Sequence, residues 1–127
     1  MSTPPRPTDA ELAILRVLWM RGPSTVRQVL DALHEERPTG YTTVLKMLQI
    51  MSDKRLVSRD ESDRTHIYQA RYSEADTQKQ LVDDLLDRAF GGSATQLVMR
   101  ALSSKKATPD ELAQLRRLLD EHEGGAR

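Results

Sequence analysis

The sequence contains no cysteine, and its aromatic side chains are few: one Trp, three Tyr and one Phe among 127 residues. The lack of cysteine excludes disulfides, a thiolate nucleophile, and zinc or iron–sulfur sites that need cysteine ligands. No apolar run approaches the roughly 18 residues that cross a bilayer, and no charged-then-apolar signal peptide opens the chain. We therefore expect a soluble, cytoplasmic protein that does not associate with membranes.

An excess of one charge sign is also absent. The chain carries 19 Lys and Arg against 19 Asp and Glu, so its formal net charge at pH 7 is zero. Residues 1–72 hold eleven basic and nine acidic side chains, whereas residues 73–127 hold eight and ten. This asymmetry is too small to identify a nucleic-acid-binding protein by itself, so the positions of the charges matter more than their sum.

The first part of the chain has the pattern of three short helices. Residues 1–7 contain three prolines and no apolar periodicity, which indicates a flexible N-terminal arm. Thr8 and Glu11 then have the form of a capping box before an apolar run at helical spacing, which a Gly-Pro pair ends. Ser24 is an N-cap candidate for the second helix, and the third helix begins around Gly40.

After the third helix the pattern changes to that of short strands. Residues 56–59 and 65–72 are rich in β-forming side chains, and residues 60–64 between them are polar. This predicts a β-hairpin with a charged tip. Three helices followed by such a hairpin are typical of the winged helix-turn-helix. The expected fold is therefore mainly α with a small β-hairpin (α+β), with a winged-helix DNA-binding domain over residues 8–72.

Residues 73–127 return to helical patterns that have no obvious sheet to pack on. Ser73 is the N-cap candidate of a helix that a Gly-Gly pair ends, a short apolar helix follows, and Thr108 begins the last one. Each helix carries an unpartnered apolar stripe, which favours contact with the same helices of a second copy. The expected dimerisation residues of this helical region are Leu81, Leu85, Leu86, Leu97, Leu102, Leu112, Leu115, Leu118 and Leu119.

Five short motifs extend over most of the chain: Thr8-Asp-Ala-Glu-Leu12, Leu18-Trp19-x-x-Gly22-Pro23-x-Thr25-Val26, Tyr41-Thr42-Thr43-Val44-Leu45, Met51-x-x-Lys54-x-Leu56-Val57 and Tyr68-x-x-x-Tyr72-Ser73. In this order and spacing they resemble the penicillinase repressor (BlaI/MecI/CopY) family, and the resemblance runs from about Thr8 to about Glu123. It implies a homodimeric winged-helix repressor that binds a palindromic operator in double-stranded DNA. It also implies β-lactamase genes or other stress-response genes as targets.

The chain departs from the pattern of that family at three places. Copper-sensing members carry a cysteine-rich C-terminal motif, so the lack of cysteine excludes copper sensing by that route. Members that control β-lactamase are inactivated by cleavage at an Asn-Phe bond, and the aligned dipeptide here is Arg100-Ala101. A regulatory protease is therefore a partner only if it accepts another bond. Position 55, commonly glycine, is Arg55, which is strained if its φ is positive and could also supply a phosphate contact.

The third predicted helix would read the DNA bases. In a helix-turn-helix the second helix of the motif enters the major groove N-terminus first, so its early exposed side chains meet the base edges. Val44, Leu48 and Met51 have the spacing of a buried face. The side chains left facing outward, which we assign to base readout, are Thr42, Thr43, Lys46 and Gln49.

Contacts with the DNA backbone are expected from hydroxyl and basic side chains elsewhere in the domain. The start of the second helix can offer hydroxyls and N–H groups to a phosphate, and the wing tip carries a basic residue. The expected set is Ser24, Thr25, Arg27, Tyr41, Arg55 and Arg64. Two of them have an equal alternative, Ser24 as an ordinary N-cap and Tyr41 as an inward-packed ring. The acidic neighbours of Arg64 in the wing weaken its field.

The sequence does not indicate an enzyme, a metal site or a cofactor. No glycine-rich phosphate loop, catalytic carboxylate pair or Ser/His/Asp arrangement stands out. His34, His66 and His122 lie on separate elements without a partner at metal-ligand spacing. Trp19 is expected in the core. The alternative to a repressor is a winged-helix protein–protein adaptor without specific DNA binding, which the zero net charge and acidic wing favour and the outward Thr and Lys side chains oppose.

Overall fold

The structure is a computed structural model that describes residues 5–35, 38–104 and 106–125. The chain divides into two units, Met1–Val82 and Asp83–Arg127. The boundary expected after residue 72 thus falls inside the first unit, which also includes the first half of the following helix.

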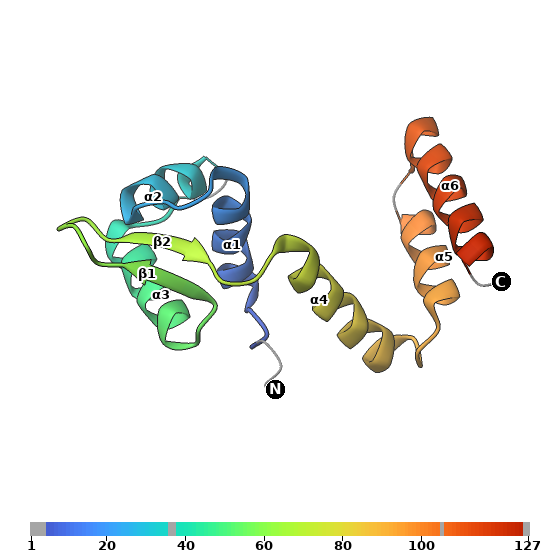
Figure 1. Cartoon of the computed structure of the whole chain (residues 1–127), viewed down its shortest axis with the longest axis horizontal. Helices are drawn as coiled ribbons and strands as arrows, with labels where there is room; N and C mark the ends of the chain where they lie inside the picture. The colour runs from blue at the N-terminus through green and yellow to red at the C-terminus, as the bar shows by residue number, and fades with distance from the viewer. Residues whose placement is uncertain (1–4, 36–37, 105, 126–127) are drawn as a thin grey trace. The chain divides into compact units, whose positions relative to one another are not determined.

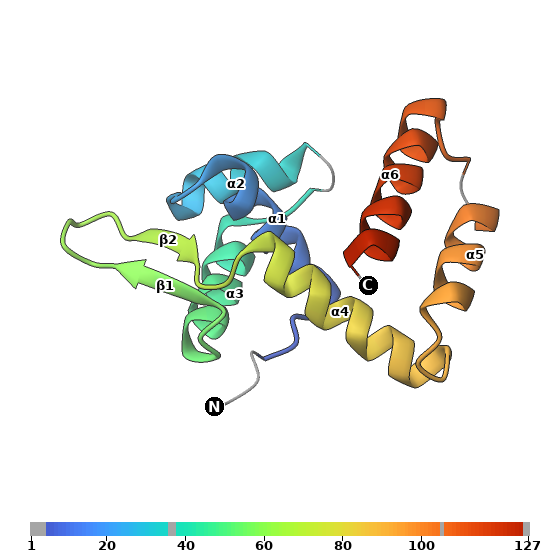
Figure 2. The ribbon, with the colours of Figure 1, turned by 45° about the vertical axis from the view of Figure 1, so that its right-hand side comes forward.

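The first unit holds three helices, a two-stranded hairpin and the beginning of a fourth helix. In chain order the elements are α1 (Asp9–Arg21), α2 (Val26–His34), α3 (Tyr41–Asp53), β1 (Val57–Asp60), β2 (Ile67–Ala70) and α4 (Glu74–Ala89). The first three helices pack around the hairpin, whose loop projects away from them (Figure 1) and does so again after a turn of the view (Figure 2). This arrangement confirms the predicted winged helix-turn-helix.

The hairpin is antiparallel, with Val57 opposite Ala70 and Asp60 opposite Ile67. Its second strand is shorter than the predicted segment 65–72, and its first strand begins and ends one residue later than predicted. The alternation within β2 puts Tyr68 in the core and Gln69 in solvent. Because successive side chains of a strand point to opposite faces, even this short strand presents one side to the core and the other to solvent.

Local capping interactions explain where the helices begin. The hydroxyl of Thr8 accepts the backbone N–H of Glu11 at 3.2 Å, and the Glu11 carboxylate accepts the backbone N–H of Thr8 at 2.9 Å. The prediction of Ser24 as the N-cap of α2 is wrong, because Thr25 holds that position and forms a capping box with Gln28. Each box provides hydrogen-bond acceptors for two backbone N–H groups, one at the N-cap and one in the first turn of the helix. Without the box these groups would have to bond to water.

The expected N-terminal arm is described only in part. Residues 1–4 lie outside the described residues, and Pro7 is buried rather than exposed. It directly precedes the Thr8 N-cap, where an apolar residue often packs against the first turn of the helix. The arm therefore ends before Pro7 in the structure.

One apolar cluster holds the first unit together. Its buried members come from all three helices and the hairpin: Ile14, Leu15, Leu18, Val26, Val29, Leu30, Leu33, Val44, Leu48, Met51, Leu56, Val57 and Tyr68. Val44, Leu48 and Met51 of α3 are completely buried, as their spacing predicted. Trp19 was expected in the core, but it is only partly buried and packs against the edge of this cluster.

The second unit contains the end of α4, then α5 (Ala94–Ser104) and α6 (Pro109–Gly125). Gly91 and Gly92 have positive φ values and end α4, with the N–H of Gly92 donating to the carbonyl oxygen of Leu86 at 2.9 Å. Thr108 begins α6 with the predicted capping box to Glu111. Among the described residues from 83 onward, none is buried, so this unit has no core of its own.

Candidate nucleic-acid interface

The exposed face of α3 carries all four side chains assigned to base readout. Thr42, Thr43, Lys46 and Gln49 are exposed, whereas the residues between them point into the core. Thr42, Lys46 and Gln49 recur at intervals of four and three residues, which aligns them along the helix surface. Because Val44 and Leu48 are fully buried, this face cannot rotate inward without exposing the core. The orientation of the row is therefore set by packing.

The same face carries an apolar residue that the sequence reasoning missed. Ile50 is 41% exposed and lies four residues after Lys46 and one after Gln49. An exposed isoleucine among polar side chains gains nothing from solvent, and apolar side chains are the usual partners of the thymine methyl group. The signal was available in the sequence, because Ile50 falls on the outward side once Val44, Leu48 and Met51 are placed inside.

A groove of about 410 Å³ opens beside the N-terminus of α3, between α2 and the end of the wing loop. Its polar lining includes Thr25, Arg27, Tyr41, Arg64 and His66. Four of these were predicted to contact the DNA backbone. His66 was not, because as a lone histidine it was considered only as a metal ligand. We call this set the wing groove.

Tyr41 lies on the outer side of the wing groove. The inward-packed alternative for this ring is wrong, because the side chain is 48% exposed. The guanidinium carbon of Arg27 lies 6.0 Å from the centroid of the Tyr41 ring, at the outer limit of a cation–π contact. The phenol O–H and the guanidinium N–H groups of these two residues can thus both donate hydrogen bonds into the wing groove.

Ser24 does not join this set. Its side chain is 1% exposed and its hydroxyl donates to the carbonyl oxygen of Gly22 at 2.8 Å. Its backbone N–H and carbonyl pair with Tyr68 in an isolated β-bridge, at 2.9 and 2.8 Å. The groups that were predicted to meet a phosphate are therefore used to join α2 to the wing, and that expectation for Ser24 is corrected.

Arg55 is also separated from the wing groove. It follows α3, at the opposite end of that helix from Tyr41, and 13 residues at about 1.5 Å each place the two helix ends about 20 Å apart. Its φ is +66°, in the left-handed region that arginine rarely adopts. The conditional prediction of strain at this position is therefore met, because the turn into β1 requires a positive φ.

Charges in the wing are partly paired. The Arg59 guanidinium lies 2.6 Å from a carboxylate oxygen of Glu61. The Asp60 carboxylate accepts the backbone N–H of Ser62 at 2.9 Å, and this bond lowers the pKa of Asp60 below its ordinary value. Asp60 therefore stays ionised near neutral pH, and Arg64 acts in a local field that contains this negative charge.

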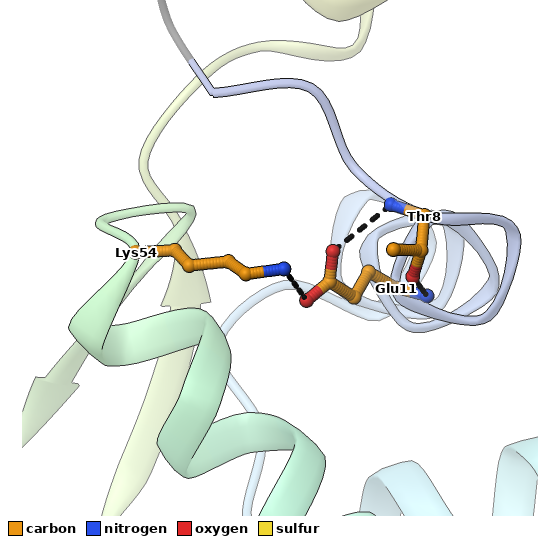
Figure 3. Close-up of polar contacts among 3 residues, drawn as sticks. All are labelled: Thr8, Glu11 and Lys54. Carbon is orange, nitrogen blue, oxygen red and sulfur yellow. Dashed lines mark hydrogen bonds and ion pairs between the residues drawn. The ribbon is translucent and has the colours of Figure 1, made fainter.

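A partly buried ion pair joins the end of α3 to the beginning of α1, and the sequence reasoning missed it. Lys54 caps the C-terminus of α3, and its Nζ lies 2.8 Å from the second carboxylate oxygen of Glu11, as Figure 3 shows. Burial alone raises the pKa of the Glu11 carboxyl, but hydrogen bonds from Lys54 and Thr8, with the charge of Lys54, outweigh it and lower the pKa. The pair ties the end of α3 to the first turn of α1.

The leucines predicted for dimerisation remain at least partly exposed in the single chain. Leu85, Leu102, Leu118 and Leu119 are the most open of the nine, with Leu119 at 66%. Val82, Val98 and Met99 add further exposed apolar surface. Surface of this kind on helices without a core is the usual mark of a protein–protein contact.

The described part of the chain contains no helix long and apolar enough to cross a membrane. Within the same residues, no three or more His, Asp and Glu side chains gather at a spacing that could hold a metal ion.

Comparison with known proteins gives consistent matches over most of the chain. The profile of the penicillinase repressor family matches residues 7–121. The transcriptional regulator BlaI of Mycobacterium tuberculosis is 36% identical over 118 residues, which cover 92% of this chain and 85% of that protein. The penicillinase repressor of Bacillus licheniformis is 23% identical over 118 residues, covering 93% of this chain and 92% of the relative.

A solved structure supports the fold. The solution structure of monomeric BlaI from Bacillus licheniformis in complex with the blaP half-operator has a TM-score of 0.51 and 24% identity. It covers 60% of this chain and 93% of that one. With a match to the family profile over nearly its whole length, the chain belongs to the penicillinase repressor family, which consists of DNA-binding transcriptional repressors and not of enzymes.

Proposed function

We propose that this protein represses transcription by binding a palindromic DNA operator as a homodimer. The observation that carries the proposal is the exposed row on α3, in which Thr42, Lys46 and Gln49 stand over a fully buried apolar face. The B. licheniformis relative has been solved with a half-operator, which supports double-stranded DNA as the ligand. Occupying promoter DNA in this way would exclude polymerase.

The chemistry of the row suits the base edges of the major groove. Lys46 can reach guanine O6 and N7, and Gln49 can pair with adenine through two hydrogen bonds. Thr42 and Thr43 can exchange hydrogen bonds with base edges, and their methyl groups, like Ile50, fit against thymine. A good bidentate pair of this kind is worth about 1–3 kcal/mol of discrimination against the wrong base.

The wing groove supplies the contacts with the DNA backbone in this proposal. Thr25, Arg27, Tyr41 and Arg64 line it, and His66 joins them as a further hydrogen-bonding group. Such contacts fix the register of α3 on the duplex without reading sequence. Ser24 is left out because its polar groups are bonded internally, and Arg55 stays a separate, untested contact at the far end of α3.

The second unit supports the homodimer. Its described residues bury no side chain, while its helices expose leucines in stripes, so the unit gains a core only from a partner. A second copy of the same helices is the simplest partner and gives the two-fold symmetry of a palindromic site. Once one subunit of the dimer has bound its half-site, the second subunit is held near the other half-site at a high effective concentration.

Target genes and induction form the finer part of the proposal. The name of the B. licheniformis relative, penicillinase repressor, supports a β-lactamase gene as the target, with another stress-response gene as the alternative. A regulatory protease acting at Arg100–Ala101 would meet a bond inside α5, so that helix must unwind locally before cleavage. Protease sensitivity of the DNA-free and DNA-bound protein tests this route.

The test of the main proposal is selection of DNA duplexes from a random library by the purified protein. We expect one palindromic site with an affinity of about 10⁻⁸–10⁻¹¹ M, and a log–log salt slope near −0.9 per phosphate neutralised. Weak, salt-sensitive binding to every duplex without enrichment would instead favour the adaptor function.

Three alanine variants refine that test. Lys46→Ala should lower the ratio of specific to non-specific affinity, whereas Arg64→Ala should weaken all sequences alike and make the salt slope less steep by about 1. Arg16→Ala is the matched control, because it removes an exposed positive charge from α1, outside the α3 row and the wing groove. An unchanged specificity ratio in Lys46→Ala would refute its role in base readout.

A further inference from the structure

The junction between the hairpin and α4 is held by a side chain from α1. The indole Nε1 of Trp19 donates to the carbonyl oxygen of Tyr72 at 3.0 Å, across 53 residues of sequence. Tyr72 follows β2 and is separated from the first residue of α4 only by Ser73. The Trp19 ring also packs on the edge of the core, so the hydrogen bond ties the junction to the rigid part of the domain.

The first turn of α4 is held at a second point. The hydroxyl of Ser73 accepts the backbone N–H of Asp76 at 3.0 Å and caps the helix. Thr77, one turn into α4, is 6% exposed and is the one residue of this helix that is buried. Two contacts, one just before the helix and one in its first turn, therefore hold the beginning of α4 to the winged-helix domain.

A small tilt at the beginning of α4 would displace its far end considerably, because the helix is long. Its 16 residues extend about 24 Å at 1.5 Å each. A tilt of about 10° at the base would move the far end by about 4 Å, which exceeds the base-pair rise of about 3.4 Å. A shallow, open groove of about 310 Å³ lies beside Trp19, Pro23 and the junction residues Tyr72 and Ser73, so this side of the junction is open to solvent.

We propose that Trp19 is a positioning residue that sets the spacing between the two operator half-sites. It would do so by fixing the junction and hence the direction of α4, while taking no part in the contact of either α3 with DNA. The inference rests on the proposed function, because only a dimer on a two-part operator has a spacing to select.

The experiment measures affinity for palindromic operators whose half-site separation is changed by −1, 0, +1 and +2 base pairs, and for one isolated half-site. Trp19→Phe keeps an aromatic ring but removes the N–H donor. Thr77→Ala loosens the second contact by a different substitution. Met20→Ala is the matched control, since Met20 is the next residue on α1 and is 86% exposed. Circular dichroism and sedimentation confirm fold and dimer mass for each variant.

The wild-type protein and Met20→Ala should lose affinity about tenfold or more for each base pair of altered spacing, because the spacing also rotates one half-site about the helix axis. In Trp19→Phe this discrimination should fall to about threefold or less, with half-site affinity unchanged within about twofold. If Trp19→Phe does not fold, the same series with Thr77→Ala decides.

The remaining outcomes separate the two proposals. Folded variants that keep the wild-type spacing preference overturn the positioning role of Trp19 and leave the repressor function intact. A wild-type protein that binds both half-sites but tolerates every spacing also overturns it. Absence of any specific half-site binding by the wild type would instead refute the proposed function.

Discussion

Both units of this chain carry apolar side chains on their helices, but they differ in what surrounds those side chains. In the winged-helix unit, Val44 and Leu48 on α3 are completely buried by α1, α2 and the hairpin. In the C-terminal unit, Leu118 and Leu119 are 51% and 66% exposed. The first set stabilises the chain within one molecule. The second set stays exposed in the single chain, and under the proposed function it is covered by a second copy. Folding of the first unit and assembly of the second are then separable properties.

A repeated motif extends the comparison to polar groups. Thr8 with Glu11 and Thr108 with Glu111 form the same capping box at the start of α1 and α6. Glu11 is buried and also pairs with Lys54, whereas Glu111 lies in solvent. The same sequence pattern thus caps a helix and takes part in a tertiary contact in the first unit, whereas in the second unit it only caps a helix.

The largest expected effect is on assembly. Leu115→Asp places a charge in the apolar stripe of α6 and should separate the dimer. Loss of the second half-site contact should lower operator affinity by about 10²–10⁴-fold, with the affinity for a single half-site unchanged. Sedimentation and binding assays on the same samples measure both quantities.

Gln114→Asp is the control for that variant, because it adds the same charge to an exposed position one residue away on α6. It should keep the dimer mass and the operator affinity. A Leu115→Asp protein that still sediments as a dimer would place the dimer contact outside this stripe.

The next effect is on the core of the winged helix. Leu48→Ala should lower the free energy of unfolding by about 2–5 kcal/mol, because it removes completely buried methyl groups and leaves a cavity. Leu119→Ala, the same substitution at a largely exposed site, should leave this transition unchanged and weaken the dimer instead. Fluorescence of Trp19, the single tryptophan, follows urea unfolding of the first unit alone. Equal effects of the two substitutions on that transition would contradict the division of roles.

A smaller effect is expected at the buried capping box. Glu11→Gln keeps an acceptor for the Thr8 N–H but loses the charge that pairs with Lys54, and should cost about 1–2 kcal/mol at pH 7. Lys54 is partly exposed and stays hydrated, which limits the loss. Glu111→Gln, the matched change on α6, should cost less.

The pH dependence of stability follows from the lowered pKa of Glu11. A carboxyl whose pKa is lower in the folded than in the unfolded state stabilises the fold above its unfolded pKa, which lies near 4.5. That contribution is lost as the pH falls through the folded pKa. The wild type should therefore lose its advantage over Glu11→Gln below about pH 4.5. Unfolding measured from pH 7 to pH 3 tests this, and parallel curves for the two proteins would contradict it.

Features encoded over a few neighbouring residues were predictable from the sequence. The capping boxes at Thr8 and Thr108, the helix end at Gly91 and Gly92, and the polar hairpin loop all depend on local backbone geometry. The exposed face of α3 followed from the spacing of its buried side chains. These signals were sufficient for the fold and for the exposed row on α3, whose part in base readout stays a prediction.

Features that depend on distant contacts were not predictable in the same way. Glu11 and Lys54 are 43 residues apart, and Trp19 and Tyr72 are 53 apart. The bridge between Ser24 and Tyr68 was equally hidden from the sequence. The place of His66 in the wing groove likewise depends on the hairpin meeting α2 and α3. The wrong N-cap assignment at Ser24 has a local cause instead, because Thr25 and Gln28 have the capping-box spacing that the sequence analysis overlooked.

The smallest expected effect concerns Arg55, where a backbone requirement and a side-chain function can be separated. Its φ of +66° suits glycine better than arginine, so Arg55→Gly should relieve strain of about 1–2 kcal/mol. The greater freedom of glycine in the unfolded chain opposes this, leaving a net stabilisation of about 0.5–1 kcal/mol. Arg55→Asn, which also tolerates positive φ, should give a similar gain without the added freedom of glycine in the unfolded chain.

If Arg55 also binds a phosphate, both variants should become more stable and yet bind DNA with a salt slope less steep by about 0.9. Greater stability with an unchanged slope would restrict Arg55 to the turn between α3 and β1, and no gain in stability would mean that the turn carries no strain.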